Sequence, residues 1–460
     1  MLCCLYVFIF YFAESDGFRF SNSWNWLELP GSWAMGELGI SLSFGVDGMA
    51  VMMILLTGIV MFTGAIISCN ISSWNKDFFI LYLLLLSGVF GVFATLDLFF
   101  FFFFYELSVV PMYLLIGVWG SSSKFKTFSR TKEYGAMKLT LYLVAGSVLI
   151  WIGLIAIFVE ADLGTFDIQA LSQADYSSDF QRIFFPVLVV GFGILAGMWP
   201  FHTWSPDGHV AAPTSVSMVH AGVLMKLGAF GIIRVAMYIL PEGAEFWMPV
   251  VVVLGTVNVL YGAISAMGQH DLKYVIGYSS VSHMGYVLMG IATLHPLGIT
   301  GAVLQMFSHG VMTALLFAAV GTIYASTHTR DINTLNGLAK RMSKASKFFV
   351  LAGLASLGLP GLSGFVAELL VFLGLFHTYP ILGALGIVGA TITAVYILRL
   401  IGRVFFGPIK DPLRIESDAS PSEILSSGIL ALGILVVGVF PFPFIKIINS
   451  STEEILSKFI

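Results

Sequence analysis

The chain has 460 residues, of which 58% are hydrophobic and 10% are charged, and its formal net charge is −4. Apolar stretches of about 20 residues recur from end to end, which is the length that a helix needs to cross a bilayer. This composition excludes a soluble globular protein. It predicts an all-α polytopic membrane protein that has the lipid bilayer, and not nucleic acid, as a partner.

Thirteen apolar segments follow one another along the chain, and the first of them is short. Lipid offers no hydrogen bonds to backbone groups, so segments of this length and uniform apolarity must be helices and not barrel strands. They lie near residues 1–12, 46–68, 77–95, 98–119, 135–158, 183–217, 218–240, 246–267, 274–292, 296–324, 346–377, 380–407 and 424–446. We therefore predict about 13 transmembrane helices.

Basic residues divide unequally between the loops on the two sides of the predicted helices. The loops on the starting side carry fifteen, whereas the opposite loops carry only Arg19 and Arg182. This asymmetry predicts that the basic side, called side A below, is cytoplasmic, and that side B faces outward. The fifteen are Lys76, Lys124, Lys126, Arg130, Lys132, Lys273, Arg330, Lys340, Arg341, Lys344, Lys347, Arg399, Arg403, Lys410 and Arg414.

Redox and metal centres are not expected in this chain. Its three cysteines are too few for a disulfide scaffold or a metal cluster, and its short loops contain no Gly-rich nucleotide fingerprint. His202, Asp207 and His209 could suggest a metal site, but their spacing beside two prolines fits a loop cap better. Met1 to Phe12 lacks the basic start of a signal peptide, so we interpret it as part of a membrane helix.

Two predicted helices are longer than one span requires and are interrupted inside. The stretch 191–213 contains three prolines, and the stretch 351–365 contains Pro360 and four glycines. Broken helices at corresponding positions of two halves indicate an ion path, because their freed backbone groups must line a polar cavity or be buried. The breaks lie five helices apart, so we predict two inverted repeats, about 77–240 and 246–407.

Glu106 lies near the middle of the apolar run 98–119, where a carboxylate costs about 2.5 to 3.5 kcal/mol on insertion scales. An ionisable group at membrane depth is therefore a functional-site candidate by default. Acids, lysines and histidines that alternate across the bilayer are what a proton relay requires. The other candidates of this kind are Lys226, Glu368, Lys273, His283, His309 and His220.

Most of these candidates also have a structural interpretation. Glu106 and Lys226 could each belong to a fixed ion pair that only stabilises the bundle. His283 and His309 could be satisfied core histidines, because their small neighbours permit tight helix packing. The six phenylalanines 99–104 occupy every face of their helix, so they are most simply apolar bulk.

Several motifs together carry a family resemblance. FFFFFFYELSVVPMYLLIGVWG, PFHTWSPDGHVAAPTS, AGVLMKLGAFGIIR, DLKYVIGYSSVSHMGYVL, QMFSHGVMTALLF, THTRDINTLNGLAKRM and LPGLSGFVAELLVF resemble, in this order, subunit M of respiratory complex I, the counterpart of chain 4. The resemblance runs from about Gly45 to Pro443. It implies a proton-pumping, antiporter-like membrane subunit of NADH:quinone oxidoreductase, set beside other antiporter-like subunits in a bacterial plasma membrane and not a mitochondrial one.

The resemblance also implies roles and departures. NADH, FMN, iron–sulfur clusters and quinone would belong to partner subunits, and this chain would hold no redox cofactor. Glu106 would be the glutamate of the family's fifth helix, Lys226 the lysine of the eighth, and Glu368 the acid of the broken twelfth. The family's lysine at the first break falls on Leu195, so His220 and His202 become the nearest replacement carriers.

The family has fourteen helices, and Met1 to Phe12 would match its second. We expect the first to be missing through a misplaced start codon. The chain would then consist of residues 1–45, a residual helix and outer loop; 46–423, the proton-translocating domain; and 424–460, a last helix and tail.

The mechanism that we expect is a switchable ion pair between Glu106 and Lys226. Breaking the pair would release a proton from Lys226 toward Glu368. Three alternatives stay open: a subunit of a multisubunit cation/proton antiporter or membrane-bound hydrogenase, a stand-alone transporter, and a non-pumping structural spacer that the missing lysine would favour.

Overall fold

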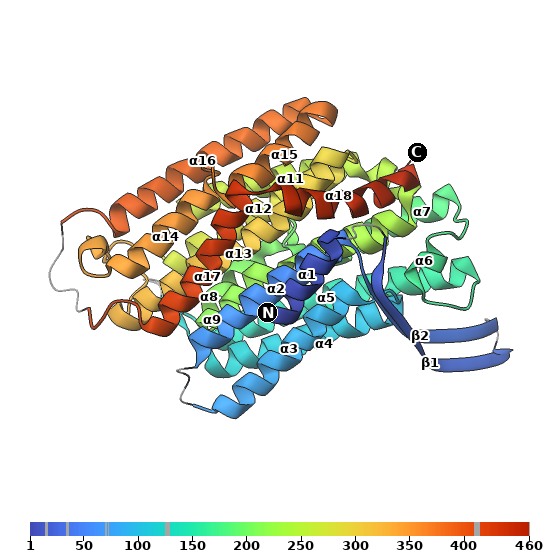
Figure 1. The fold of residues 1–460 in the computed structure, drawn as a ribbon, viewed down its shortest axis with the longest axis horizontal. Helices are drawn as coiled ribbons and strands as arrows, with labels where there is room; N and C mark the ends of the chain where they lie inside the picture. The colour runs from blue at the N-terminus through green and yellow to red at the C-terminus, as the bar shows by residue number, and fades with distance from the viewer. Residues whose placement is uncertain are drawn as a thin grey trace.

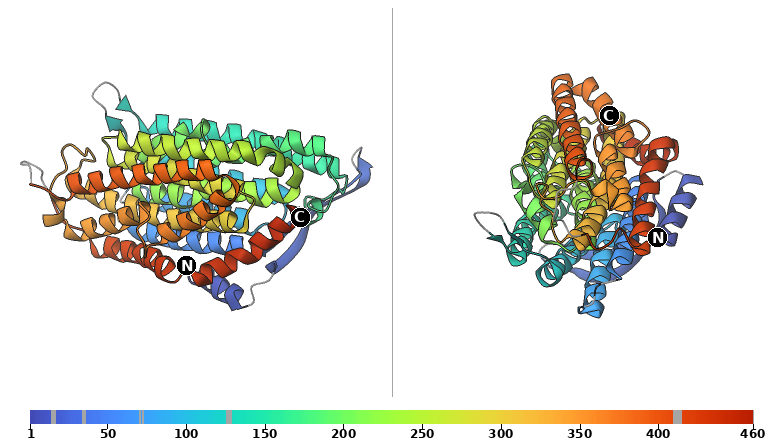
Figure 2. Two further views of the ribbon diagram at one scale, coloured as in Figure 1. Left: turned by 90° about the horizontal axis from the view of Figure 1, so that it is seen from above. Right: turned by 90° about the vertical axis from the view of Figure 1, so that its left-hand side faces the viewer.

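The computed structural model describes residues 1–13, 17–33, 36–69, 71, 73–124, 129–408 and 415–459. Lys126, Lys410 and Arg414, three of the basic residues assigned to side A, lie outside the described residues. The helices run mostly side by side along the longest axis, and side A lies at the left and side B at the right of Figure 1. The views of Figure 2 show one elongated helical bundle.

The elements of the first part are α1 (Leu2–Ala13), β1 (Arg19–Trp33), β2 (Gly36–Val46), α2 (Gly48–Ser68), α3 (Asn75–Ala94), α4 (Leu98–Trp119), β3 (Ser123–Lys124), β4 (Ser129–Arg130), α5 (Lys132–Ala161), α6 (Ile168–Leu171), α7 (Ser178–Ala196), η1 (Phe201–Thr203), α8 (Trp204–Ala211), α9 (Thr214–Val219), η2 (His220–Leu224), α10 (Met225–Gly231) and η3 (Ile232–Met237). Here η1 is a 3-10 turn, whereas η2 and η3 are π-helical and continue α9 and α10 as one run.

The elements of the second part are α11 (Pro241–Met267), α12 (Leu272–Ala292), α13 (Pro296–Thr327), η4 (Leu338–Lys340), α14 (Ser343–Ser356), α15 (Ser363–Thr378), α16 (Pro380–Val404), α17 (Pro421–Val439), α18 (Phe442–Leu456) and η5 (Ser457–Phe459). Aspartates cap several of the long helices: Asp47, Asp97 and Asp271 accept hydrogen bonds from first-turn backbone N–H groups of α2, α4 and α12. Such caps fix where each helix begins.

Eleven helical runs in the described part of the chain are long and apolar enough to cross a membrane. The two remaining predicted segments are the short α1 and the broken pair α14 and α15. The all-α polytopic fold is therefore confirmed, and so are the thirteen segments as helices.

Both predicted helix breaks are present. In the first, α7 ends at Ala196 and Gly197 adopts a φ of +76° before the chain resumes as η1 and α8. In the second, Gly358 and Gly361, with φ of +73° and +91°, separate α14 from α15. Glycine adopts these left-handed conformations without the strain that a Cβ would cause, so it permits the chain to leave the helix there.

A pair of backbone bridges relates the two halves. On side B, Asp97 bridges Asp167, and Leu98 N–H donates to Phe166 O at 2.8 Å. On side A, Asp271 bridges Asp331 in the same antiparallel manner, and Leu272 N–H donates to Arg330 O at 3.0 Å. Equivalent bridges on opposite sides are what inverted repeats produce. The repeat and domain boundaries stay predictions.

The outer loop predicted before residue 46 contains a long antiparallel hairpin that the sequence did not predict. Strand β1 pairs with β2, beginning at Arg19 opposite Val46. The alternation of Ile40, Leu42 and Phe44 with serines has the period of two that a half-buried strand requires. This short pattern is weaker than the helical pattern of the neighbouring apolar segments, so it did not lead to a strand prediction.

The last predicted helix, 424–446, also differs. Instead of one helix the structure has α17, a bend at Phe440 and Pro441, and α18, which extends to Leu456 and packs against α2 and α13. Proline is unfavourable inside a helix and favourable in its first turn, so the Phe-Pro-Phe-Pro sequence ends one helix and starts the next.

Candidate functional site

Lys226 is fully buried in the centre of the bundle, within the run Thr214–Met237. Its Nζ donates to the carbonyl oxygen of Ala221 and lies 2.7 Å from His309 Nδ1. The π-helical turn η2 ends at Leu224, two residues before Lys226, and such turns frequently mark functional positions in helices. The structure thus joins two of the predicted site residues directly.

Two glycines allow this contact. A Cβ on Gly222 would lie 3.1 Å from Gly310 O, and one on Gly310 would lie 2.5 Å from Gly222 O. Neither position leaves room for a larger residue, so η2 and α13 approach each other closely. Small residues at helix crossings have this effect in membrane proteins. The close crossing brings the Lys226 amine within reach of His309, the residue before Gly310.

The line continues from His309 to Glu368. The rings of His309 and His283 have centroids 5.3 Å apart, and His283 Nδ1 lies 3.5 Å from Glu368 Oε1. Ser356 Oγ is 3.0 Å from His283 Nε2, and the Gln305 amide is 3.2 Å from Nδ1, so both nitrogens of this ring have partners. Four predicted site residues from four helices therefore form one connected row.

Glu368 reaches this row because of the second helix break. Its helix α15 starts after the break, and a Cβ on Gly358 would lie only 2.9 Å from Glu368 Oε2. Glycine at this position lets the carboxylate pack against the exposed backbone of the break. The side chain is 7% exposed, so the carboxylate lies inside the bundle.

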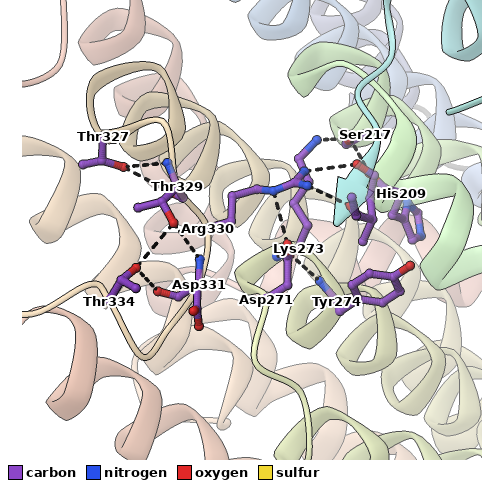
Figure 3. Close-up of polar contacts among 12 residues, drawn as sticks. His209, Ser217, Asp271, Lys273, Tyr274, Thr327, Thr329, Arg330, Asp331 and Thr334 are labelled. Carbon is purple, nitrogen blue, oxygen red and sulfur yellow. Dashed lines mark hydrogen bonds and ion pairs between the residues drawn. The ribbon is translucent and has the colours of Figure 1, made fainter. Parts of the chain in front are cut away.

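A second branch runs from the centre toward side A. Lys273 Nζ donates to Ala212 O at 2.7 Å and to Ser217 Oγ at 3.3 Å, and Ser217 Oγ donates to His209 O at 2.9 Å (Figure 3). Lys273 is 4% exposed and Ser217 is fully buried. This branch places the predicted site residue Lys273 between the centre and the basic loops.

His220 pairs with a histidine that the sequence analysis set aside. The rings of His209 and His220 have centroids 4.0 Å apart, and His209 Nε2 lies 3.1 Å from Ser205 Oγ. Both nitrogens of His220 and Nδ1 of His209 are buried without a hydrogen-bond partner. Buried polar atoms of this kind usually hold ordered water. His209 was interpreted as part of a loop cap, but Ser205 and His209 are four residues apart on α8.

Glu106 does not pair with Lys226 in this structure. The helix α4 packs mainly against α3 and α5, and Ser147 of α5 is the polar neighbour of the carboxylate. Glu106 is only partly buried, and its Oε1 has no partner. The apolar run around Glu106 predicts that it lies at membrane depth. It does not predict which face of α4 Glu106 occupies or which helix that face contacts.

At the first break, His220 and His202 were expected to replace the family's lysine as proton carriers, and the structure treats the two differently. Leu195 is fully buried at the end of α7, and the ionisable side chain that contacts Lys226 is His309 of α13. His202 lies beside Tyr261, with ring centroids 4.9 Å apart, and both of its ring nitrogens lack partners. Of the two candidates, only His220 joins a further histidine.

Asp207 is the centre of an ionic cluster that the sequence analysis missed. It forms an ion pair with Arg130, accepts a hydrogen bond from Lys138 Nζ at 2.8 Å and accepts another from Tyr274 at 2.8 Å. The predicted loop cap is wrong, because this segment is the helix α8. Within the described ranges no three His, Cys, Asp or Glu side chains are grouped to hold a metal ion.

Comparison with known proteins gives consistent matches. The family described as NADH:quinone oxidoreductase/Mrp antiporter, TM matches residues 95–393. NAD(P)H-quinone oxidoreductase chain 4 1 of Picosynechococcus sp. is 39% identical over 92% of this chain and 79% of its own length. Chain 4 of Acaryochloris marina is 36% identical over 98% and 84%.

Two solved structures share the fold. A chain of respiratory complex I from Thermus thermophilus superposes with a TM-score of 0.88 and 26% identity, covering 99% of this chain and 92% of that chain. A chain of the Mrp complex from Dietzia sp. gives a TM-score of 0.81 at 19% identity, covering 99% and 90%, which shows a common fold alone.

Proposed function

We propose that this chain, which belongs to the chain 4 family of antiporter-like membrane subunits of NADH:quinone oxidoreductase, moves protons across the membrane through the row from Lys226 to Glu368. The supporting observation is the continuity of that row: Lys226, His309, His283 and Glu368 follow one another at 2.7 Å, 5.3 Å between rings, and 3.5 Å. Only the step between the two histidines needs a bridging water.

The chemistry of each step follows from the side chains. An ammonium in a desolvated site without a carboxylate partner is costly, so Lys226 passes its proton to His309 Nδ1, which faces it. A histidine can accept a proton on one nitrogen and release one from the other. His309 Nε2, which has no protein partner, is then the outlet toward His283, and Glu368 receives the proton at the second break.

Uptake takes place through the branch on side A. Lys273 donates to Ser217, and Ser217 donates to the backbone oxygen of His209, whose ring lies beside that of His220. The free ring nitrogens of this pair provide places for water along the way. In this proposal His220 carries protons in the half where the resemblance expects a lysine at Leu195.

Glu106 has a different place in the proposal. The residues one turn away on its helix, Phe103 and Val110, are 48% and 58% exposed, so this face of α4 is on the outside of the subunit. An adjoining membrane subunit would cover it, and Glu106 would then pass charge between subunits and not within this one.

The chain is a multi-pass membrane subunit, and the redox chemistry takes place elsewhere in the complex. NADH, FMN, iron–sulfur clusters and quinone would be bound by partner subunits, and their reactions would drive the protonation changes here. The proposed location is a bacterial plasma membrane; a thylakoid membrane is the alternative that the cyanobacterial relatives suggest. Fractionation of the source cells distinguishes the two.

The decisive experiment is Lys226→Gln in the assembled complex, reconstituted in liposomes. We expect protons translocated per NADH oxidised to fall sharply, because the substitution removes the first carrier of the row. Lys446→Gln is the matched control, since Lys446 is exposed and packs on Phe12. An unchanged ratio in Lys226→Gln would support the non-pumping spacer. Cation exchange without NADH oxidation would support the antiporter.

A further inference from the structure

Arg330 lies in the loop after α13 and ties together three other parts of side A. Its Nη2 donates to Ser123 Oγ at 2.9 Å, its Nη1 donates to Val210 O at 3.2 Å, and its Nε lies 3.3 Å from Asp271 Oδ2 (Figure 3). The guanidinium also rests on the ring of Tyr324, 5.2 Å from its centroid. A surface arginine rarely has this many partners, and this one is 7% exposed.

What Arg330 covers is the outer end of the uptake branch. Figure 3 shows its side chain reaching across between Asp271 and the segment that carries His209, with the side chain of Lys273 passing beside the guanidinium toward Ser217. The charges of Arg330 and Asp271 both act on Lys273. Since Lys273 is 4% exposed and Ser217 is fully buried, solvent on side A does not reach them while the arginine is in place.

The backbone beneath this side chain is fixed, so the side chain can move without unfolding the loop. Leu272 N–H donates to Arg330 O at 3.0 Å, and Ile332 N–H donates to His270 O at 2.8 Å. These bonds form the bridge that has its counterpart on side B. There the residue equivalent to Arg330 is Phe166, so the two halves differ in having a movable charge at this position on side A alone.

We infer that Arg330 is the gating residue of the side A opening: held by Asp271, Ser123 and Val210 O it closes the path to Lys273, and released it admits water. The role of this gate in proton uptake rests on the proposed function, whereas the labelling experiment below tests the gate itself and does not depend on that function. With the gate open, water reaches the Lys273 amine and brings protons to it. With the gate closed, the cation of Arg330 repels further positive charge and fills the opening.

The test measures access to a thiol beneath the gate. Ser217→Cys places the reporter beside Lys273, in a chain whose exposed thiols are removed by Cys3→Ser and Cys69→Ser. Membranes containing the whole complex are prepared with side A outward and treated with sulfonatoethyl methanethiosulfonate. The reagent is an anion, so Arg330 attracts it, and faster labelling without the arginine can only reflect opening. Mass spectrometry gives the labelled fraction at position 217.

We expect Arg330→Gln to speed labelling by roughly tenfold or more, because reaction at a buried thiol follows the population of the open form. Arg330→Lys keeps the charge but loses the fork, so it should label at nearly the same high rate. Lys340→Gln, an exposed cation of the same loop, is the control and should leave labelling slow. Equal rates with and without Arg330 would overturn the inference.

Two further measurements keep the test decisive. Asp271→Asn removes the carboxylate partner of Arg330, while asparagine can still cap α12. It should also raise the labelling rate, and it replaces Arg330→Gln in the test if that variant does not assemble. Protons per NADH should fall in every variant that labels fast, since an open gate lets protons return. A faster labelling rate with an unchanged proton ratio would keep the gate but contradict the proposed function of the row beneath it.

Discussion

The two broken helices occupy the same place in their halves, but the acidic residues that follow the two breaks have different partners. At the first break, between α7 and α8, the acid that follows is Asp207, which is held by Arg130, Lys138 and Tyr274. At the second, between α14 and α15, the acid that follows is Glu368, whose ion-pair partner in the described part of the chain is a histidine.

The difference shows what a helix break supplies and what it does not. A break exposes backbone and makes room for a carboxylate at membrane depth. Whether that carboxylate can exchange protons depends on its neighbours. Two cations and a hydroxyl hold Asp207 as a fixed anchor. The ion-pair partner of Glu368 is instead a histidine, so in the proposed function Glu368 is the acceptor at the end of the row.

The largest effect is expected at the second break. Glu368→Gln keeps the shape of the side chain but removes its proton-accepting carboxylate, so proton translocation in the assembled complex should fall by about a hundredfold. Glu416→Gln is the matched control, because Glu416 also pairs with a histidine, His328, but both are mostly exposed. If the two variants pump equally well in reconstituted liposomes, Glu368 is not an acceptor of the row.

At the first break the same change should affect stability and not coupling. Asp207→Asn leaves Lys138 and Arg130 without their carboxylate, at a cost of about 3 kcal/mol in unfolding free energy. Thermal unfolding in detergent measures the loss, and protons per NADH in the surviving complex should stay near the wild-type value. Adding Lys138→Met to Asp207→Asn should restore part of the stability, because it removes the uncompensated cation.

The substitution Leu195→Lys tests whether a lysine is all that the first break needs in order to carry protons. Leu195 is fully buried, so the new ammonium should cost roughly 2 to 3 kcal/mol, and protons per NADH should not rise. Leu195→Met, which conserves volume, is the control and should cost less than about 1.5 kcal/mol. A higher proton ratio in Leu195→Lys would mean that the two breaks are equivalent after all.

The sequence was sufficient for the features that depend on composition and local pattern. Apolar length predicted the spans, and proline and glycine predicted the breaks. The residue types predicted the row, since Lys226, His309, His283 and Glu368 were all singled out and all meet. What the sequence could not give is which faces of different helices touch, so it could not show that the polar neighbour of Glu106 in this structure is Ser147 and not Lys226. Asp207 was undervalued because its partners Arg130 and Lys138 lie some 70 residues away.

The smallest effect concerns the two backbone bridges. Asp271 on side A has the cation of Arg330, whereas its counterpart Asp97 on side B has the backbone N–H groups of Phe99, Phe100 and Ser41 and the nearby Asp167. Burial is the main cause that raises the pKa of the Asp97 carboxyl from 3.8 to about 6, and the hydrogen bonds only partly oppose it.

The sign of the resulting pH dependence follows from proton uptake. Between pH 4 and 6 the folded chain holds a proton on Asp97 that the unfolded chain has lost, so stability falls as the pH rises through this window and stays lower above it. Asp97→Asn keeps a good helix cap and removes the titration, so it should be more stable than the wild type at pH 7, by on the order of 2 kcal/mol, and equally stable at pH 4. Thermal unfolding in detergent from pH 4 to pH 8 measures this difference, with the exposed Asp175→Asn as control. A constant difference across that range would mean that the cap, and not the charge, distinguishes the bridge on side B from the one on side A.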